Sequence, residues 1–404
     1  MDDKWHRDMV EATRLTRAGR LNEATAFLQR LLRGKATPDS ESAGTHGATR
    51  AGGQPIIDAT AETVEPPDVQ PSPPPERPHM PGVLRSLLDR VKRVGAKPFP
   101  APETVPGGGQ FIPGSYTNQA GSRSYKLYVP TGYRGQTLPL VVMLHGCTQS
   151  PDDFAAGTRM NAFAEEHACL VAYPAQEASA NASKCWNWFS PRDQQRDQGE
   201  PSLIAGITRQ IMRDYAVDPQ RVYVAGLSAG AAAAVVVAMA YPDLYAAAGV
   251  HSGLPFGAAR NLPAALTAMR QGNPAALRHA GNVSDMPGSR RMVPTIVFHG
   301  DQDKTVHPCN GDHVVAQWKA LTAIELQTRV QRGQVPGGHA YSRTLHVDAD
   351  GQAILEQWVV HGAGHAWSGG SPAGTYTDPQ GPDATRELLR FFFEHRHPMP
   401  ARVA

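Results

Sequence analysis

Continuous apolar runs recur along the chain and predict a set of buried strands. They lie at Pro139–Leu144, Cys169–Pro174, Arg221–Ala225, Ala246–His251, Pro294–Phe298 and Leu355–Val360. Short runs without alternation are typical of parallel strands that are covered on both faces. Helical patterns separate several of them, at Glu200–Tyr215, Ala231–Ala240 and Ala384–Glu394. This order predicts an α/β fold with a mostly parallel central sheet flanked by helices.

Two further patterns refine the sheet. Ser124–Val129 alternates apolar and polar residues, which predicts an antiparallel edge strand. Asp350-Gly351 separates Tyr341–Val347 from Ala353–Val360, and this dipeptide favours a hairpin turn. Residues 255–292 have no regular strand pattern and are expected to form an insertion.

The N-terminal part differs in pattern and divides the chain into three regions. Residues 1–34 carry two amphipathic runs and predict a helical hairpin, which must dock on the rest of the chain, self-associate or bind something else. Residues 35–110 are rich in Pro and Gly and predict a disordered linker, with a short basic amphipathic helix at 82–97. Residues 111–400 then form the α/β domain.

Composition excludes several classes of protein. The formal net charge is +2, so no overall field attracts nucleic acid. No apolar run reaches the ~18 residues of a membrane-spanning helix. The N-terminus lacks the apolar core and cleavage site of a secretory signal. Among the four cysteines, Cys169 is expected in a buried strand and Cys309 in a loop.

The segment Gly226-Leu227-Ser228-Ala229-Gly230 carries the strongest chemical signal. It lies between a predicted strand and a predicted helix, which is the setting of a G-x-S-x-G nucleophile elbow. The glycines let the tight turn close, and the helix N-terminus offers backbone N–H groups to a developing oxyanion. Ser228 is therefore the candidate nucleophile.

Two later loops supply candidates for the acid and the base. Asp301 and Asp303 follow the strand at 294–298, and His361 and His365 follow the strand at 355–360. Asp303 is favoured because it has room to curl back toward an imidazole, and His365 because it lies beyond a Gly-Ala-Gly hinge. The alternatives are that the aspartates cap a helix and that the histidines are ordinary loop residues. A metal site at His361 and His365 is disfavoured because Gly362 and Gly364 oppose a helix.

The oxyanion donors and the substrate cleft also have candidates. The loop after Leu144 is placed like the loop that donates one oxyanion N–H in α/β-hydrolases, which assigns the backbone of Cys147 and of Ala229 as donors. Four aromatic residues in or beside loops near the proposed triad are candidates to line an apolar cleft. They are Trp186, Trp188, Phe189 and Trp367.

Six motifs in order give the chain a family resemblance. They are Leu-His-Gly-Cys-Thr-Gln at 144–149, Cys-Trp-Asn-Trp-Phe at 185–189, Gly-Leu-Ser-Ala-Gly at 226–230, His-Ser-Gly-Leu-Pro at 251–255, His-Gly-x-x-Asp at 299–303 and Gly-His-Ala-Trp-Ser-Gly-Gly at 364–370. From about residue 121 to 397 the chain resembles the poly(3-hydroxybutyrate) depolymerase family of esterases, which is related to feruloyl and acetylxylan esterases. The resemblance implies an α/β-hydrolase fold with Ser228 as nucleophile, Asp303 as orienting acid and His365 as base, without a cofactor or metal.

The resemblance adds three expectations. Cys147 and Cys185 both lie in family motifs and are candidates for a disulfide near the site, which would favour an oxidising compartment. The family is mostly extracellular, whereas the N-terminus has no visible signal peptide, so a cytoplasmic location stays open. Residues 82–97 are either a solvated linker helix or a contact with a polymer granule or anionic surface.

The predicted activity is ester hydrolysis, and the substrate stays open. The first hypothesis is a serine esterase acting on short-chain polyhydroxyalkanoate or its oligomers. The alternatives are a feruloyl or acetylxylan esterase, a general short-chain carboxylesterase, and a noncatalytic binding protein on a hydrolase scaffold.

Overall fold

The computed structural model describes residues 108–273, 292–322 and 324–398. The predicted helical hairpin at 1–34, nearly all of the predicted linker and the predicted helix at 82–97 lie outside the described residues.

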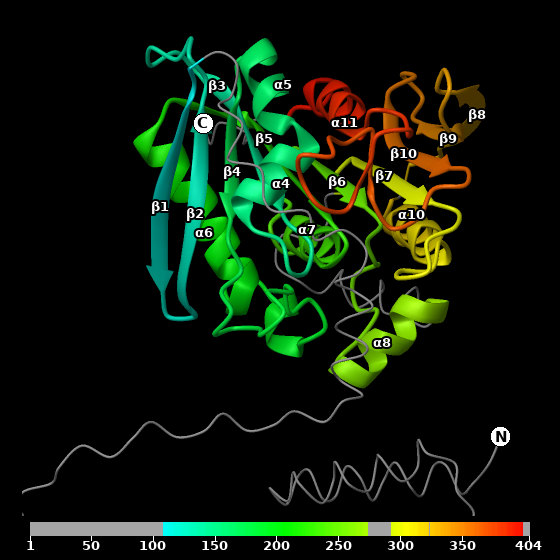
Figure 1. The fold of residues 1–404 in the computed structure, drawn as a ribbon, viewed down its shortest axis with the longest axis horizontal. Helices are drawn as coiled ribbons and strands as arrows, with labels where there is room; N and C mark the ends of the chain where they lie inside the picture. Colours follow the sequence, from blue (N-terminus) through cyan, green and yellow to red (C-terminus); the bar gives the residue numbers. More distant parts are fainter. Residues whose placement is uncertain (1–107, 274–291, 323, 399–404) are drawn as a thin grey trace, which may run out of the picture. The chain divides into compact units, whose positions relative to one another are not determined.

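The described residues form a ten-stranded sheet with the order β1-β2-β4-β3-β5-β6-β7-β10-β9-β8 (Figure 1). Its central strands β4, β3, β5, β6, β7 and β10 pair in parallel. Antiparallel strands complete both ends, with β2 and β1 on one side and β9 and β8 on the other. The strands are β1 (Gln110–Asn118), β2 (Gly121–Val129), β3 (Leu138–Leu144), β4 (Leu170–Pro174), β5 (Val217–Leu227), β6 (Ala247–His251), β7 (Thr295–Gly300), β8 (Gln327–Gln334), β9 (Ala340–Val347) and β10 (Ala353–Val360).

Helices cover both faces of the sheet and divide the core into two clusters. Successive side chains of a strand point to opposite faces, so Val142 of β3 packs in one cluster and Val141 in the other. One cluster contains residues of α6, α7, α8 and α10, and the other contains residues of α4, α5 and α11. The helices are α4 (Pro151–Thr158), α5 (Met160–His167), α6 (Gly199–Asp214), α7 (Ala229–Ala240), α8 (Leu262–Gln271), α10 (Cys309–Leu321) and α11 (Ala384–Phe393).

The predicted α/β architecture is confirmed, and every residue of β3, β4, β6 and β7 is buried. The predicted hairpin is confirmed as β9 and β10, with Gly351 at φ +84° in the turn. The region predicted as an insertion contains α8, and its residues 274–291 lie outside the described residues. A short 3₁₀ helix (Pro191–Gln194) and a small two-stranded sheet of β11 (Trp367–Ser368) and β12 (Thr377–Asp378) complete the described elements.

One predicted strand has a different place in the sheet. The segment at Ser124–Val129 belongs to β2, which is not an edge strand, because β1 pairs with it along its whole length. The true edges are β1 and β8. The sequence pattern did not indicate β8, because its residues are almost all exposed and include Val330, of which 59% is exposed. Within the described part of the chain, no helix is long and apolar enough to span a membrane.

Candidate active site

Ser228 occupies a strained turn between β5 and α7. Its backbone angles, φ 58° and ψ −120°, lie in a region that residues other than glycine rarely adopt. Such backbone strain is concentrated at functional sites. A Cβ atom on Gly226 would lie 2.4 Å from the backbone of Gly230, and one on Gly230 would lie 2.0 Å from the carbonyl oxygen of Leu144. Only glycine therefore fits at either position. The backbone N–H of Ser228 donates to the carbonyl of His251 at 2.9 Å, which fixes the turn to β6.

Asp303 and His365 are brought together at the same edge of the sheet. The carboxyl ends of β5, β6, β7 and β10 meet there, and the loops after β7 and β10 carry the two residues. Nδ1 of His365 lies 2.7 Å from Oδ2 of Asp303. The other carboxylate oxygen accepts the N–H groups of Thr305 and Val306 at 2.8 and 2.9 Å. The carboxylate is thus held in one orientation.

The electrostatics keep Asp303 ionised. Burial raises the pKa of its carboxyl group, but hydrogen bonds from His299 and His365 outweigh this and hold the pKa well below its ordinary value. An ionised carboxylate only accepts hydrogen bonds, so Nδ1 of His365 carries a proton. The lone pair of His365 then lies on Nε2, where a base needs it.

Asp301 and His361 form a separate pair. Nδ1 of His361 lies 3.0 Å from Oδ2 of Asp301, and both side chains are partly exposed. The two loops are also joined by backbone bonds, from the N–H of Asp301 to the carbonyl of Val360 and from the N–H of Gln302 to that of Ala363. Each aspartate therefore has its own histidine, and Asp303 and His365 form the more buried pair.

The loop after β3 lies against the nucleophile turn. A Cβ atom on Gly146 would lie 3.7 Å from the Cβ of Ser228. The structure gives the backbone N–H groups of Cys147 and Ala229 no hydrogen bond to another described residue. Both groups thus keep the donor capacity that an oxyanion site requires.

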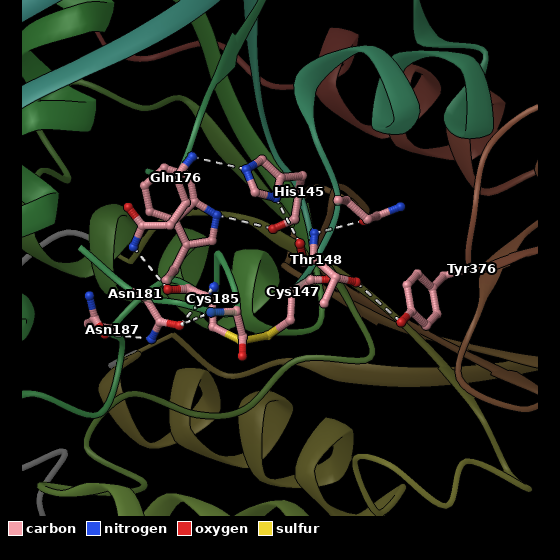
Figure 2. The surroundings of a disulfide bond; sticks show 12 residues. His145, Cys147, Thr148, Gln176, Asn181, Cys185, Asn187 and Tyr376 are labelled. Atoms are coloured by element: carbon pink, nitrogen blue, oxygen red, sulfur yellow. Dashed lines mark hydrogen bonds between the residues drawn. A yellow bond between two sulfur atoms is a disulfide. The ribbon is translucent and has the colours of Figure 1, made fainter. Parts of the chain in front are cut away.

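A disulfide joins this loop to a second segment. Cys147 and Cys185 are bonded, with their Cα atoms 4.2 Å apart, as the family motifs suggested. Figure 2 shows the bond between the loop after β3 and residues 181–187. Next to it, the N–H of Thr148 donates to the carbonyl of Ser183 at 2.7 Å, and Gln176 donates to that of Cys185 at 2.9 Å. The loop after β3 is therefore fixed covalently and by hydrogen bonds.

Two buried histidines support the site, and the sequence patterns gave neither a role. Burial lowers the pKa of His145 to about 4. Its Nε2 accepts the N–H of Gln176 at 3.0 Å, and its Nδ1 lies 2.7 Å from the carbonyl of Gly146 (Figure 2). Burial lowers the pKa of His251 to about 3, and its Nε2 accepts the N–H of Ser368 at 3.0 Å. His251 therefore connects the strand beside Ser228 to the loop that carries His365.

The prediction that tryptophans line an open cleft disagrees with their burial. Trp186 is fully buried and donates its indole N–H to the carbonyl of His145 at 3.1 Å. Trp367 is also buried and donates to the hydroxyl of Thr385 at 3.0 Å. Trp188 is buried against Phe189, which is itself half-buried. The loops fold inward at these positions, so the rings form core behind the site.

An exposed aromatic residue that the sequence patterns did not indicate lies beside the loop after β3. Tyr376 is 40% exposed, and its hydroxyl lies 3.4 Å from that of Thr148 (Figure 2). Its φ is +53°, and its carbonyl accepts the N–H of Trp367, two residues after His365. Tyr376 thus contacts both the loop after β3 and the loop that carries His365. Only long-range packing gives it this place.

Among the described residues, no group of three or more His, Cys, Asp or Glu side chains is arranged to hold a metal ion.

The fold and the turn at Ser228 together define an α/β-hydrolase. The acetyl xylan esterase from Aspergillus awamori has the same fold, with a TM-score of 0.54 and 21% identity over 70% of this chain and 99% of that chain. Residues 123–335 match the family described as Esterase PHB depolymerase, and the chain belongs to this family of carboxylic ester hydrolases. The matched range includes Ser228 and Asp303, and His365 lies beyond it.

Curated relatives are depolymerases and esterases. The chain is 34% identical to poly(3-hydroxyalkanoate) depolymerase C of Paucimonas lemoignei, over 65% of this chain and 61% of that protein. It is 27% identical to feruloyl esterase B of Thermothelomyces thermophilus, over 56% of this chain and 78% of that protein. It is 29% identical to a probable acetylxylan esterase A of Aspergillus fumigatus, over 51% of this chain and 56% of that protein. The chain thus spans less than two thirds of the length of the depolymerase.

Proposed function

We propose that this protein is a serine esterase in which Ser228 is the nucleophile, His365 the general base and Asp303 the residue that orients the base. The observation that carries the proposal is the combination of a strained serine turn with a buried, ionised aspartate hydrogen-bonded to a histidine at the same sheet edge. Membership of the esterase family supports the same reaction.

The reaction is a two-step acyl transfer. Nε2 of His365 takes the proton of Ser228 while the serine oxygen attacks the ester carbonyl, and Asp303 stabilises the imidazolium that forms. The N–H groups of Cys147 and Ala229 stabilise the oxyanion, each donor contributing about 3–4 kcal/mol. The alcohol leaves with the proton from His365, and water activated by the same histidine releases the acid.

The test is the turnover of p-nitrophenyl butyrate by Ser228→Ala. We expect turnover to be lost while the far-UV circular dichroism spectrum stays unchanged. Ser122→Ala, which alters an exposed serine on β2, is the matched control and should retain full activity. Retained turnover in Ser228→Ala would remove Ser228 from the mechanism.

For the substrate, we propose short-chain hydroxyalkanoate esters or their oligomers. The support is the family match and the relative that is named a poly(3-hydroxyalkanoate) depolymerase. The alternative substrate is a feruloyl or acetylxylan ester. Its support is the fold match to an acetyl xylan esterase and the relatives named feruloyl and acetylxylan esterases. A panel of hydroxybutyrate trimer, ethyl ferulate and acetylated xylan separates the two. The proposal requires the highest kcat/KM for the trimer, and a higher value for either of the others would refute it.

We also propose that residues 82–97 contact an apolar polymer granule or an anionic surface. The support is their sequence, which combines five basic residues with an apolar stripe. Deletion of residues 1–97 should weaken partition of the protein onto polyester particles. Unchanged partition would assign this segment to the linker instead.

A further inference from the structure

A second chain of hydrogen bonds from a serine to a histidine to an aspartate lies outside the proposed active site. Oγ of Ser342, on β9, lies 2.9 Å from Nε2 of His361 at the end of β10. Nδ1 of His361 lies 3.0 Å from Oδ2 of Asp301, in the loop after β7. Each link has ordinary hydrogen-bond length, so the three side chains form a complete relay.

The relay is oriented for proton transfer from the serine. The backbone N–H of Gly362 donates to Oδ1 of Asp301 at 2.8 Å, which fixes the carboxylate. Burial raises the pKa of Asp301, but hydrogen bonds, the first from His361, outweigh this and lower the pKa below its ordinary value. The ionised carboxylate accepts from Nδ1 of His361, so Nε2 carries the lone pair and accepts from the hydroxyl of Ser342.

A basic residue lies opposite this serine on the neighbouring strand. Arg332 of β8 is directly opposite Ser342 in the antiparallel register, and directly opposite residues share one face of the sheet with Cβ atoms about 5 Å apart. Arg332 is exposed and has no ion pair with another described residue. His361 is also exposed, and Ser342 is half-buried. Small molecules can therefore reach the hydroxyl, and a guanidinium is available to a developing negative charge.

We propose that Ser342, His361 and Asp301 form a second nucleophilic site, which accepts acyl or phosphonyl groups from activated esters and fluorophosphonates. With p-nitrophenyl acetate, a bond forms between Oγ of Ser342 and the carbonyl carbon, the bond to p-nitrophenolate breaks, and the serine proton passes to Nε2 of His361. With a fluorophosphonate, an O–P bond forms, the P–F bond breaks, fluoride leaves, and the proton takes the same path.

The expected rate follows from what the two sites share and what they lack. Both have an oriented histidine, and a general base contributes about 10²–10⁴-fold. Ser342 lies within a regular strand, without the turn and helix N-terminus that follow Ser228. The loss of one oxyanion donor costs about 10²–10³-fold. Arg332 can take the place of one of the two donors proposed for Ser228, so the loss of the other makes Ser342 react about 10²–10³-fold more slowly than Ser228. Ser342 is therefore expected to be labelled but not to turn over esters efficiently.

The experiment uses the full-length Ser228→Ala variant with a fluorophosphonate probe, followed by digestion and mass spectrometry of the peptide that contains Ser342. We expect an adduct on Ser342 that is absent in Ser228→Ala/Ser342→Ala. Adding His361→Gln should slow labelling by at least about 10²-fold, because the general base is lost. Asp301→Asn serves as a second variant of the relay if His361→Gln does not fold, and thermal unfolding of each variant checks this.

The same sheet contains an internal control. Oγ1 of Thr328 lies 3.0 Å from Nδ1 of His346, a hydroxyl–imidazole pair on β8 and β9 that has no carboxylate partner among the described residues. Thr328 should remain unlabelled under the same conditions. Absence of an adduct on Ser342, or labelling at an equal rate after His361→Gln or Asp301→Asn, would overturn the proposal. Labelling of Ser228 in the wild-type protein is read on a different peptide, so failure of the proposed esterase mechanism is seen separately.

Discussion

Gln149 holds the loop after β3 through a buried side-chain amide. Its Oε1 accepts the N–H of Gly146 at 2.8 Å, and its Nε2 donates to Oδ2 of Asp153 at 2.9 Å and to the carbonyl of Thr375 at 3.1 Å. This one side chain therefore joins the loop after β3 to α4 and to the segment before Tyr376. Replacing it with leucine, which has a similar size, removes all of these bonds at once.

The magnitude follows from the groups left behind. Gln149→Leu leaves the N–H of Gly146 and the carbonyl of Thr375 without this partner, whereas Asp153 keeps the bond from the hydroxyl of Thr375. A buried polar group without a partner costs about 1–3 kcal/mol, so the free energy of unfolding should fall by about 2–6 kcal/mol. The freed loop also misplaces the N–H of Cys147. We expect kcat to fall about 10–100-fold. This is less than the fall in kcat of about 10²–10³-fold on complete loss of one oxyanion donor, because the N–H group is displaced and not removed.

Two measurements and a companion variant check this reasoning. Urea denaturation gives the free energy of unfolding, and p-nitrophenyl butyrate gives kcat. Gln149→Glu restores an acceptor for Gly146 but sets a second carboxylate against Asp153, so it should recover part of kcat and remain less stable than the wild type at neutral pH. If Gln149→Leu loses the expected stability while kcat stays at the wild-type value, the loop does not depend on this side chain, and the argument is refuted.

Three further predictions concern the same region. The double variant Cys147→Ser/Cys185→Ser removes the covalent link between two residues with a sequence separation of 38. The free energy of unfolding, measured in urea, should fall by about 4 kcal/mol because the unfolded chain gains conformational entropy. An unchanged free energy of unfolding would contradict this chain-entropy argument. Asp303 has a lowered pKa, so its carboxylate stabilises the fold above its ordinary pKa of about 3.9, and this stability is lost as the pH falls through the lower folded value. The stability advantage of the wild type over Asp303→Asn should therefore shrink between pH 7 and pH 3, and a gap that stays constant would show that the carboxylate is not the cause. Tyr376→Ala should lower kcat/KM about 10-fold for p-nitrophenyl hexanoate and less for p-nitrophenyl acetate, because about 1–2 kcal/mol of apolar contact with the acyl chain is lost. Tyr376→Phe keeps the ring, so kcat/KM for both esters should stay at the wild-type value. Equal effects on the two esters would place the ring away from the acyl group.

Local sequence was sufficient for the centre of the sheet and for the strained turn at Ser228. The segments at β3 and β7 are continuous apolar runs, and such runs are stable only when both faces are covered. The turn at Ser228 was equally visible, because the glycines at 226 and 230 reflect close contacts of the backbone with itself and with β3. The edge strand β8 was missed, because a strand exposed on its faces has no reason to be apolar.

Contacts between distant segments depended on the tertiary structure. Asp303 and His365 are 62 residues apart, and the sequence favoured Asp303 over Asp301 without showing that each aspartate has its own histidine partner in the fold. Trp186 and Trp188 lie in a loop and Trp367 in the two-residue strand β11, and the burial of all three depends on how these segments fold over the core. The position of Tyr376 beside Thr148 likewise depends on the tertiary structure. A short window of sequence records which residues prefer water or a given backbone shape, but the pairing of side chains is set by the order and direction of strands that lie far apart along the chain.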